Sequence, residues 1–142
     1  MTFATALTRL EVLTFTGLVS NLGAVDQPPQ LPDLPALVTE DVSLPFNESL
    51  KAWNIQATTT VLTVFIDHVL LIEGINQGTF ETRWANTILY TDRYTAAISA
   101  DMFLNNTLIE PLQLIVLNRG IVEVRLAEFS GIRFRHHWRI KV

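Results

Sequence analysis

Few side chains in this sequence are of the types that metal binding or catalysis requires, and they gather at two places. The three histidines are His68, which follows Asp67, and the neighbours His136 and His137. Both pairs lie in segments that predict β-strands, where adjacent side chains point to opposite faces, so neither pair can bind one ion as neighbours. A metal site would require a pairing of strands that brings His68 and His136 together. The sequence favours the alternative, in which each strand holds one buried, hydrogen-bonded histidine.

The sequence also lacks the patterns that accompany nucleophilic catalysis, which needs a serine, threonine or cysteine activated by an adjacent base. It contains no cysteine and no G-x-S-x-G sequence, and its six glycines do not gather into a phosphate-binding loop. Adjacent carboxylates such as Glu40 and Asp41 stand beside loop sequence, where solvation explains them. We therefore expect no catalytic, cofactor-binding or metal-binding residues, no cofactor, and a protein that is not an enzyme.

The most pronounced chemical pattern is a row of cations in the last twelve residues, GIRFRHHWRIKV. Apolar side chains occupy one parity of this segment, with His136 as their single polar member, and basic side chains occupy the other parity. Arg125 on the preceding predicted strand extends the basic set. The set predicted to form an interface or a lumen face is Arg125, Arg133, Arg135, Arg139 and Lys141.

Three interpretations of this basic face stay open. It can be the solvated polar face of an antiparallel sheet, neutralised by cross-strand pairs such as Glu123 with an arginine. It can dock against the acidic body of a neighbouring subunit, because residues 1–118 hold four cations and twelve acids whereas residues 119–142 hold six cations and two acids. It can also contact a nucleic acid backbone, in which case affinity would fall steeply with rising salt.

Two helices are predicted from apolar residues that recur at helical spacing, over 2–14 and from Thr79 to about residue 105. The second helix shows one apolar stripe, which we expect to face the core. Its members are Phe80, Trp84, Ile88, Thr91, Thr95, Ile98 and Met102.

Strands are predicted where β-branched and alternating apolar residues gather, and the longest covers 58–73. Turns are predicted at Asn118–Gly120 and Glu128–Gly131. The shorter strands are expected over 18–22, 36–40, 112–117 and 121–126, before the final basic strand. This order predicts a single α+β domain over 1–142, with a mainly antiparallel or mixed sheet and two helices packed on one face.

Two segments are predicted to connect these elements without regular structure of their own. Residues 24–35 hold four of the six prolines and predict an extended, polyproline-like connector. Residues 41–56 contain Pro45 and mixed polarity, and we expect an extended arm or loop there. Trp53 in this segment is a candidate interface anchor, whereas Trp84 and Trp138 are expected in the core.

The overall composition indicates self-association. Hydrophobic residues make up 49% of the 142 residues, and the mean hydropathy is +0.29. A small domain with this much apolar surface is expected to bury part of it against partners. The most apolar stretch, Val61 to Ile72, is too short to span a bilayer and contains Asp67 and His68, so we expect a soluble protein without a membrane partner.

Three stretches resemble small neck and tail-completion proteins of tailed bacteriophages. In LTFTGLVSNLGAVDQPPQLPDLPALV, as in that family, a helix ends at a T-x-T-G turn and a proline-rich link leads into LPAL. The run TRWANTILYTDRYTAAISADMFLNNTL is similar to the family's second helix, and GIRFRHHW to its closing strand. The loop after the helix departs from the family's D-P-T-L kind, since it reads Asn105-Asn-Thr-Leu108.

The resemblance is to the tail terminator class, whose members form hexameric rings that cap the tail tube and dock to the head connector. It implies a structural virion protein of the head–tail junction, assembled in the host cytoplasm, whose partners are copies of itself and neighbouring neck and tail-tube proteins. DNA passing through the lumen would be contacted without sequence specificity. Another neck ring protein, an adaptor or a stopper, is the nearest alternative, and a small nucleic-acid- or ligand-binding α+β domain is the alternative of a different class.

Overall fold

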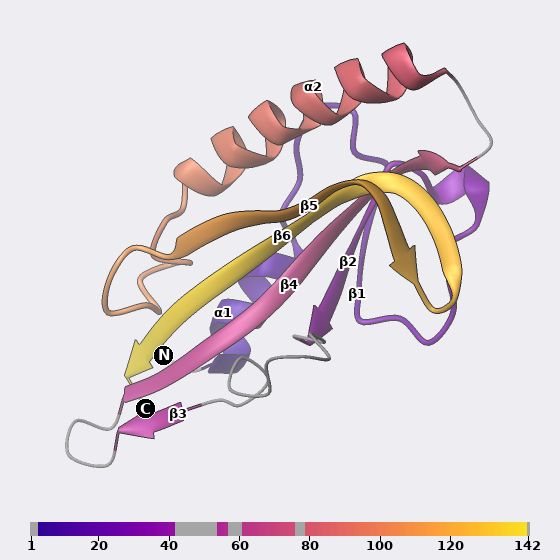
Figure 1. Ribbon diagram of the computed structural model, residues 1–142. Coiled ribbons are helices and arrows are strands. Elements are labelled where there is room, and N and C mark those ends of the chain that lie inside the picture. Colours follow the sequence, from indigo (N-terminus) through magenta and orange to yellow (C-terminus); the bar gives the residue numbers. More distant parts are fainter. Residues whose placement is uncertain (1–2, 42–53, 57–60, 76–78, 142) are drawn as a thin grey trace.

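The fold is taken from a computed structural model, which describes residues 3–41, 54–56, 61–75 and 79–141 (Figure 1). Its order of helices and strands is the α+β order predicted from the sequence. The elements are α1 (Phe3–Glu11), β1 (Ser20–Gly23), a short 3-10 turn η1 (Leu31–Asp33), β2 (Ala36–Asp41), β3 (Asn54–Gln56), β4 (Val61–Gly74), α2 (Phe80–Ser99), β5 (Gln113–Val124) and β6 (Ala127–Lys141).

The strands form one mixed sheet in the order β1-β2-β4-β6-β5, and β3 pairs with β4 off this path. Only β1 and β2 are parallel, whereas the other described pairs are antiparallel, as predicted. The central pair is β4 with β6, which runs from Val61 opposite Lys141 to Gly74 opposite Phe129. Strands β1 and β5 are therefore the two edges of the sheet.

Both helices pack on one face of this sheet, which confirms the predicted layout. Ala6 and Leu10 of α1, together with Tyr94 and Ile98 of α2, belong to the same buried apolar cluster as the inward residues of β4 and β6. Trp138 is fully buried in this cluster, as expected. In Figure 1, α2 extends along β5 and β6.

The opposite face is covered by the curled end of the β5–β6 hairpin and by the proline-rich connector. Val122, Val124 and Phe129 of the hairpin form a second buried cluster with residues of β2 and β4, and Val25 and Leu34 of the connector pack against it. The connector is not extended throughout, because Leu31–Asp33 forms the 3-10 turn η1. Its prolines nevertheless keep it out of the sheet, since proline lacks a backbone donor.

The two turns predicted near the C-terminus are wrong. Residues 118–120 lie inside β5, which continues to Val124 across a bulge between Val116 and Asn118. The chain reverses instead at Arg125 and Leu126, whose φ angles are +50° and +68°. A two-residue hairpin turn with positive φ at both positions favours glycine and asparagine, so Arg-Leu gives no turn signal.

The glycines that suggested turns mark a bend in a continuous hairpin. Gly120 and Gly131 lie opposite each other in the β5–β6 ladder. A side chain at position 131 would collide with the backbone carbonyl oxygen of Leu70, so glycine is required where β6 crosses β4 at this point. Gly120 has a φ of +128°, a conformation that favours glycine.

Within helix α2, the buried stripe shares only Ile98 with the one predicted. The helix ends at Ser99, and its buried residues are Thr87, Tyr94 and Ile98. Phe80 and Trp84, expected in the core, are 72% and 47% exposed. The predicted arm over 41–56 lies outside the described residues except for residue 41, which ends β2, and Asn54–Gln56, which forms β3. Trp53 also lies outside them.

Candidate functional site

The predicted basic row lies on the face of β6 opposite the helices, where one of its members is buried against an acid. Arg135 of β6 is paired in register with Asp67 of β4. Its Nε and Nη2 donate to the two carboxylate oxygens of Asp67 at 2.7 and 2.9 Å. Asp67 is fully buried and Arg135 is only 5% exposed. Such a bidentate geometry compensates the desolvation of both charges.

Arg133 extends this cluster towards β2. Its Nη1 donates to Asp67 Oδ2 at 2.9 Å and to Glu40 Oε2 at 3.0 Å. Burial alone would lower the pKa of Arg133, but the hydrogen bonds and negative charges of Asp67 and Glu40 outweigh it and raise the pKa above its usual value. Two acids and two arginines thus form a formally neutral cluster.

The remaining basic residues of the row lie outside this cluster. Arg139 Nη1 approaches Glu110 Oε2 at 3.4 Å, and both side chains are partly exposed. Arg125 Nε donates to the carbonyl oxygen of Val25 at 2.9 Å. Lys141 is exposed at the end of β6. The row is therefore not one continuous cationic face, and its role as an interface or lumen surface stays a prediction.

On the helix face, the same two strands hold a buried polar network. Nδ1 of His68 lies 2.8 Å from the hydroxyl oxygen of Tyr94, and this oxygen lies 2.6 Å from Nε2 of His136. The indole nitrogen of Trp138 donates to Nδ1 of His136 at 3.3 Å. The pairing of β4 with β6 therefore brings the two histidines together, and a tyrosine of α2 joins them.

The donors in this network can be assigned from the indole, which only donates. Nδ1 of His136 must accept, so neutral His136 carries its proton on Nε2 and donates it to the Tyr94 oxygen. The Tyr94 hydroxyl then donates to Nδ1 of His68, which places the proton of His68 on Nε2. That nitrogen is buried and has no hydrogen-bond partner among the described residues.

Burial keeps all three groups of the network neutral. It lowers the pKa of His136 to about 3, against the opposing effect of the Asp67 charge. Burial, followed by repulsion from His136, lowers the pKa of His68 well below its usual value. Burial also raises the pKa of Tyr94. Since none of the three side chains reaches solvent, the network can order the core but cannot meet a substrate.

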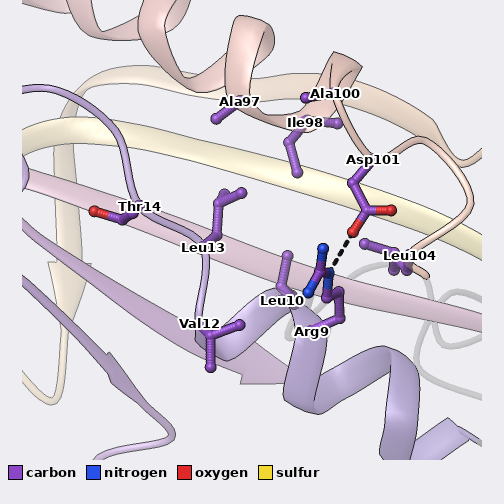
Figure 2. A pocket seen from close by; sticks show the side chains of 10 residues that line it. All are labelled: Arg9, Leu10, Val12, Leu13, Thr14, Ala97, Ile98, Ala100, Asp101 and Leu104. Carbon is purple, nitrogen blue, oxygen red and sulfur yellow. Dashed lines mark hydrogen bonds and ion pairs between the residues drawn. The ribbon is translucent and has the colours of Figure 1, made fainter.

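A hollow of about 250 Å³ separates the end of α1 from the end of α2 (Figure 2). Arg9 Nε donates to Asp101 Oδ2 across it at 2.6 Å. Although burial opposes it, hydrogen bonds from Arg9 and from the backbone N–H of Asn105 lower the pKa of Asp101. The two charged groups neutralise each other. Their ion pair therefore links the ends of the two helices, and the described residues that line the hollow offer no unpaired charge to a ligand.

A second hollow of about 250 Å³ lies between α2 and β5 and is mainly apolar. Phe80, Trp84 and Ile121 line it, and each of them is strongly exposed. The guanidinium of Arg119 lies 4.4 Å from the centre of the Trp84 ring, within the range of a cation–π contact. Large aromatic side chains at a solvent-facing hollow are typical of contact surfaces between proteins.

Sequence reasoning missed both Tyr94 and this exposed surface. The buried residues Thr87, Tyr94 and Ile98 also follow helical spacing, so two stripes on α2 competed. Asp67 inside an apolar strand was a signal for a buried partner, since a buried carboxylate must be paired.

Replacing Asp67 with alanine should lower the free energy of unfolding by about 3–5 kcal/mol, because Arg135 would remain buried without its partner. Urea denaturation followed by circular dichroism measures this loss. The matched control is Glu110→Ala, which breaks the partly exposed pair with Arg139 and should cost at most about 1 kcal/mol. Equal effects of the two changes would contradict the assigned role of the buried pair.

Replacing Tyr94 with phenylalanine keeps the ring that stacks on Phe134 at 3.9 Å but removes the hydroxyl between the histidines. Each histidine nitrogen left unpaired should cost about 1–3 kcal/mol of unfolding free energy. The control is Tyr90→Phe, on the same helix at a half-buried position, which should stay within about 0.5 kcal/mol of the unchanged protein. Indistinguishable denaturation midpoints for both variants would rule out the network.

The free energy of unfolding should fall as pH drops from about 6.5 towards about 3. The unfolded chain takes up protons at His68 and His136 near the ordinary histidine pKa, whereas the folded chain does not, since its histidine pKa values are lowered. Each histidine contributes a slope of up to about 1.4 kcal/mol per pH unit. Urea titrations between pH 7 and pH 5, above most carboxylate titration, measure it.

The control for this pH dependence is His137→Gln. Burial also lowers the pKa of His137, which is partly exposed, so this change should remove only a small part of the slope. A free energy of unfolding that stays flat between pH 7 and pH 5 would show that the two buried histidines are not held neutral.

Comparison with known protein families and curated proteins found no relative of this chain. No model of a protein family matches the chain, and a search of curated proteins finds no match. Among the described residues, no helix is long and apolar enough to cross a membrane, and no three or more histidine or acidic side chains are grouped to hold a metal ion. A functional proposal must therefore rest on the contacts and exposed surfaces described above.

Proposed function

We propose that this chain is a structural, non-enzymatic subunit of a homo-oligomeric ring in a tailed-phage virion. The proposed place is the head–tail junction, where the chain would act as a tail terminator that caps the tail tube. An adaptor or stopper ring of the same neck is the alternative. The resemblance of the sequence to neck and tail-completion proteins supports the choice of class.

The observation that carries the proposal is the exposed apolar surface at the N-terminal half of α2. Phe80, Trp84 and Ile88 follow one another at four-residue spacing and are 72%, 47% and 43% exposed. A subunit that functions alone gains nothing from exposing two aromatic rings on one helix face, whereas a subunit of an assembly buries them against its neighbour.

The buried charge cluster supports assembly in preference to nucleic-acid binding. Arg133 and Arg135 are neutralised by Asp67 and Glu40 within the subunit, so they are not available to release counterions from a phosphate backbone. At the end of β6, Lys141 is exposed and Arg139 is partly exposed. They are the residues that we assign to any lumen contact with DNA.

Light scattering coupled to size-exclusion chromatography tests the proposal, with negative-stain imaging of the same fractions. The expected result is a closed ring, whose mass for a hexamer is six times the 16.0 kDa of one chain. Trp84→Glu should convert the ring to smaller species without changing the circular dichroism spectrum, because the side chain is exposed. A monomer at every concentration, with no ring in the images, would overturn the proposal.

A further inference from the structure

We propose that copies of this chain meet head to tail, with the α2–β5 surface of one copy on the β1 edge of the next. The α2–β5 surface consists of Phe80, Trp84, Ile88, Arg83, Arg119 and Ile121. The β1 edge consists of Val12, Val19, Leu22, Glu11 and Asp26. This inference rests on the proposed ring and adds to it which two surfaces of the subunit are in contact.

The hollow in the α2–β5 surface has the size of a side-chain receptor. Its volume of about 250 Å³ is below the roughly 300–1,000 Å³ of typical small-molecule pockets. Its walls are mostly apolar, and Phe80, Trp84 and Ile121 present their rings and methyl groups to solvent. An apolar side chain from another polypeptide fits these properties better than a polar metabolite does.

The charges around this hollow have one sign. Arg83 and Arg119 line it, and no described carboxylate does. Arg119 is held over the ring of Trp84, so its charge stays at the centre of the surface. A partner that covers the surface must therefore supply acidic groups or leave two cations desolvated without compensation.

The β1 edge offers apolar side chains of the required kind. Val12, Val19 and Leu22 are 61%, 59% and 38% exposed. The side-chain nitrogen of Asn21 in β1 donates to the carbonyl oxygens of Leu10 and Leu13, which fixes the end of α1 against this strand. Val12 therefore follows the helix end that is fixed beside β1, and Val19 directly precedes this strand.

The same edge carries acids. The carboxylate of Glu11 lies next to Gly23, at the end of β1. Asp26 follows three residues later and is exposed, next to Val25, whose carbonyl oxygen accepts from Arg125. Glu11 and Asp26 are opposite in sign to the two arginines of the α2–β5 surface and equal to them in number.

The positions of the two surfaces favour head-to-tail contact over contact between identical surfaces. Strands β1 and β5 are opposite edges of one sheet, so one subunit can present both surfaces to two different neighbours. Contact of the α2–β5 surface with its own copy would bring Arg83 and Arg119 against the same two arginines, which is unfavourable once water is removed. Repeated head-to-tail contact closes into a ring when the rotation per subunit allows it.

A mixing experiment tests this inference. Trp84→Glu disables the α2–β5 surface, and Val19→Glu disables the β1 edge. Each variant alone should therefore lose assembly. The protein concentration needed for assembly should rise at least 30-fold, roughly the effect of losing one interface hot spot. Mixed in equal amounts, they should form a species of twice the 16.0 kDa chain mass and nothing larger, because one intact contact remains. Light scattering measures both results.

Matched variants keep the outcome interpretable. Ile109→Glu changes a residue that is 44% exposed near Arg139, outside both surfaces, and should assemble like the unchanged chain. Phe80→Glu and Leu22→Glu repeat the test on each surface should one of the first variants fail to fold, which circular dichroism detects.

The possible results separate this inference from the proposed function. If the unchanged chain forms rings and the Val19→Glu and Leu22→Glu variants also form them, the head-to-tail assignment is wrong and the ring proposal stands. Loss of assembly in the Trp84→Glu and Phe80→Glu variants alone would point to contact between identical surfaces. An unchanged chain that is always monomeric would overturn both.

Discussion

The register between β4 and β6 is the constraint on which the rest of this structure depends. Side chains alternate between the faces of a strand, so a single register must satisfy both faces at once. On one face it places Asp67 opposite Arg135, and on the other it brings His68 and His136 within reach of one tyrosine. A shift by one residue would exchange the faces, and a shift by two would leave the buried carboxylate and the guanidinium apart.

The main effect of the buried polar contacts is to select one strand register and one rotation of α2. Apolar strands such as β4 pack acceptably in several registers, because valine, leucine and isoleucine differ little in size and in chemistry. A buried ion pair adds little net stability, but its disruption is costly, so it penalises the wrong registers strongly. The histidine network does the same for α2, whose rotation about its own axis is fixed by Tyr94.

That fixed rotation leaves the first half of α2 with an apolar side facing solvent. Phe80 and Trp84 are consequently exposed although they belong to an amphipathic helix. Part of the excess of apolar residues in the composition is thus exposed on this half of α2.

The sequence was sufficient to predict the α+β class, the long central strand and the two faces of β6, since these follow from alternation, which is a local property. It was not sufficient for the partner of Arg135, because that contact depends on a register between residues 68 positions apart. The hairpin end was missed for a different reason: Arg125 and Leu126 adopt a left-handed conformation without glycine or asparagine. On α2 two stripes follow helical spacing, and periodicity alone does not determine which of them packs on the sheet.

Gly131 limits which substitutions the two central strands can accept. The absence of a side chain there lets β6 lie close to the carbonyl oxygen of Leu70. Even alanine would force the two strands apart at this point, so their close contact depends on one absent methyl group.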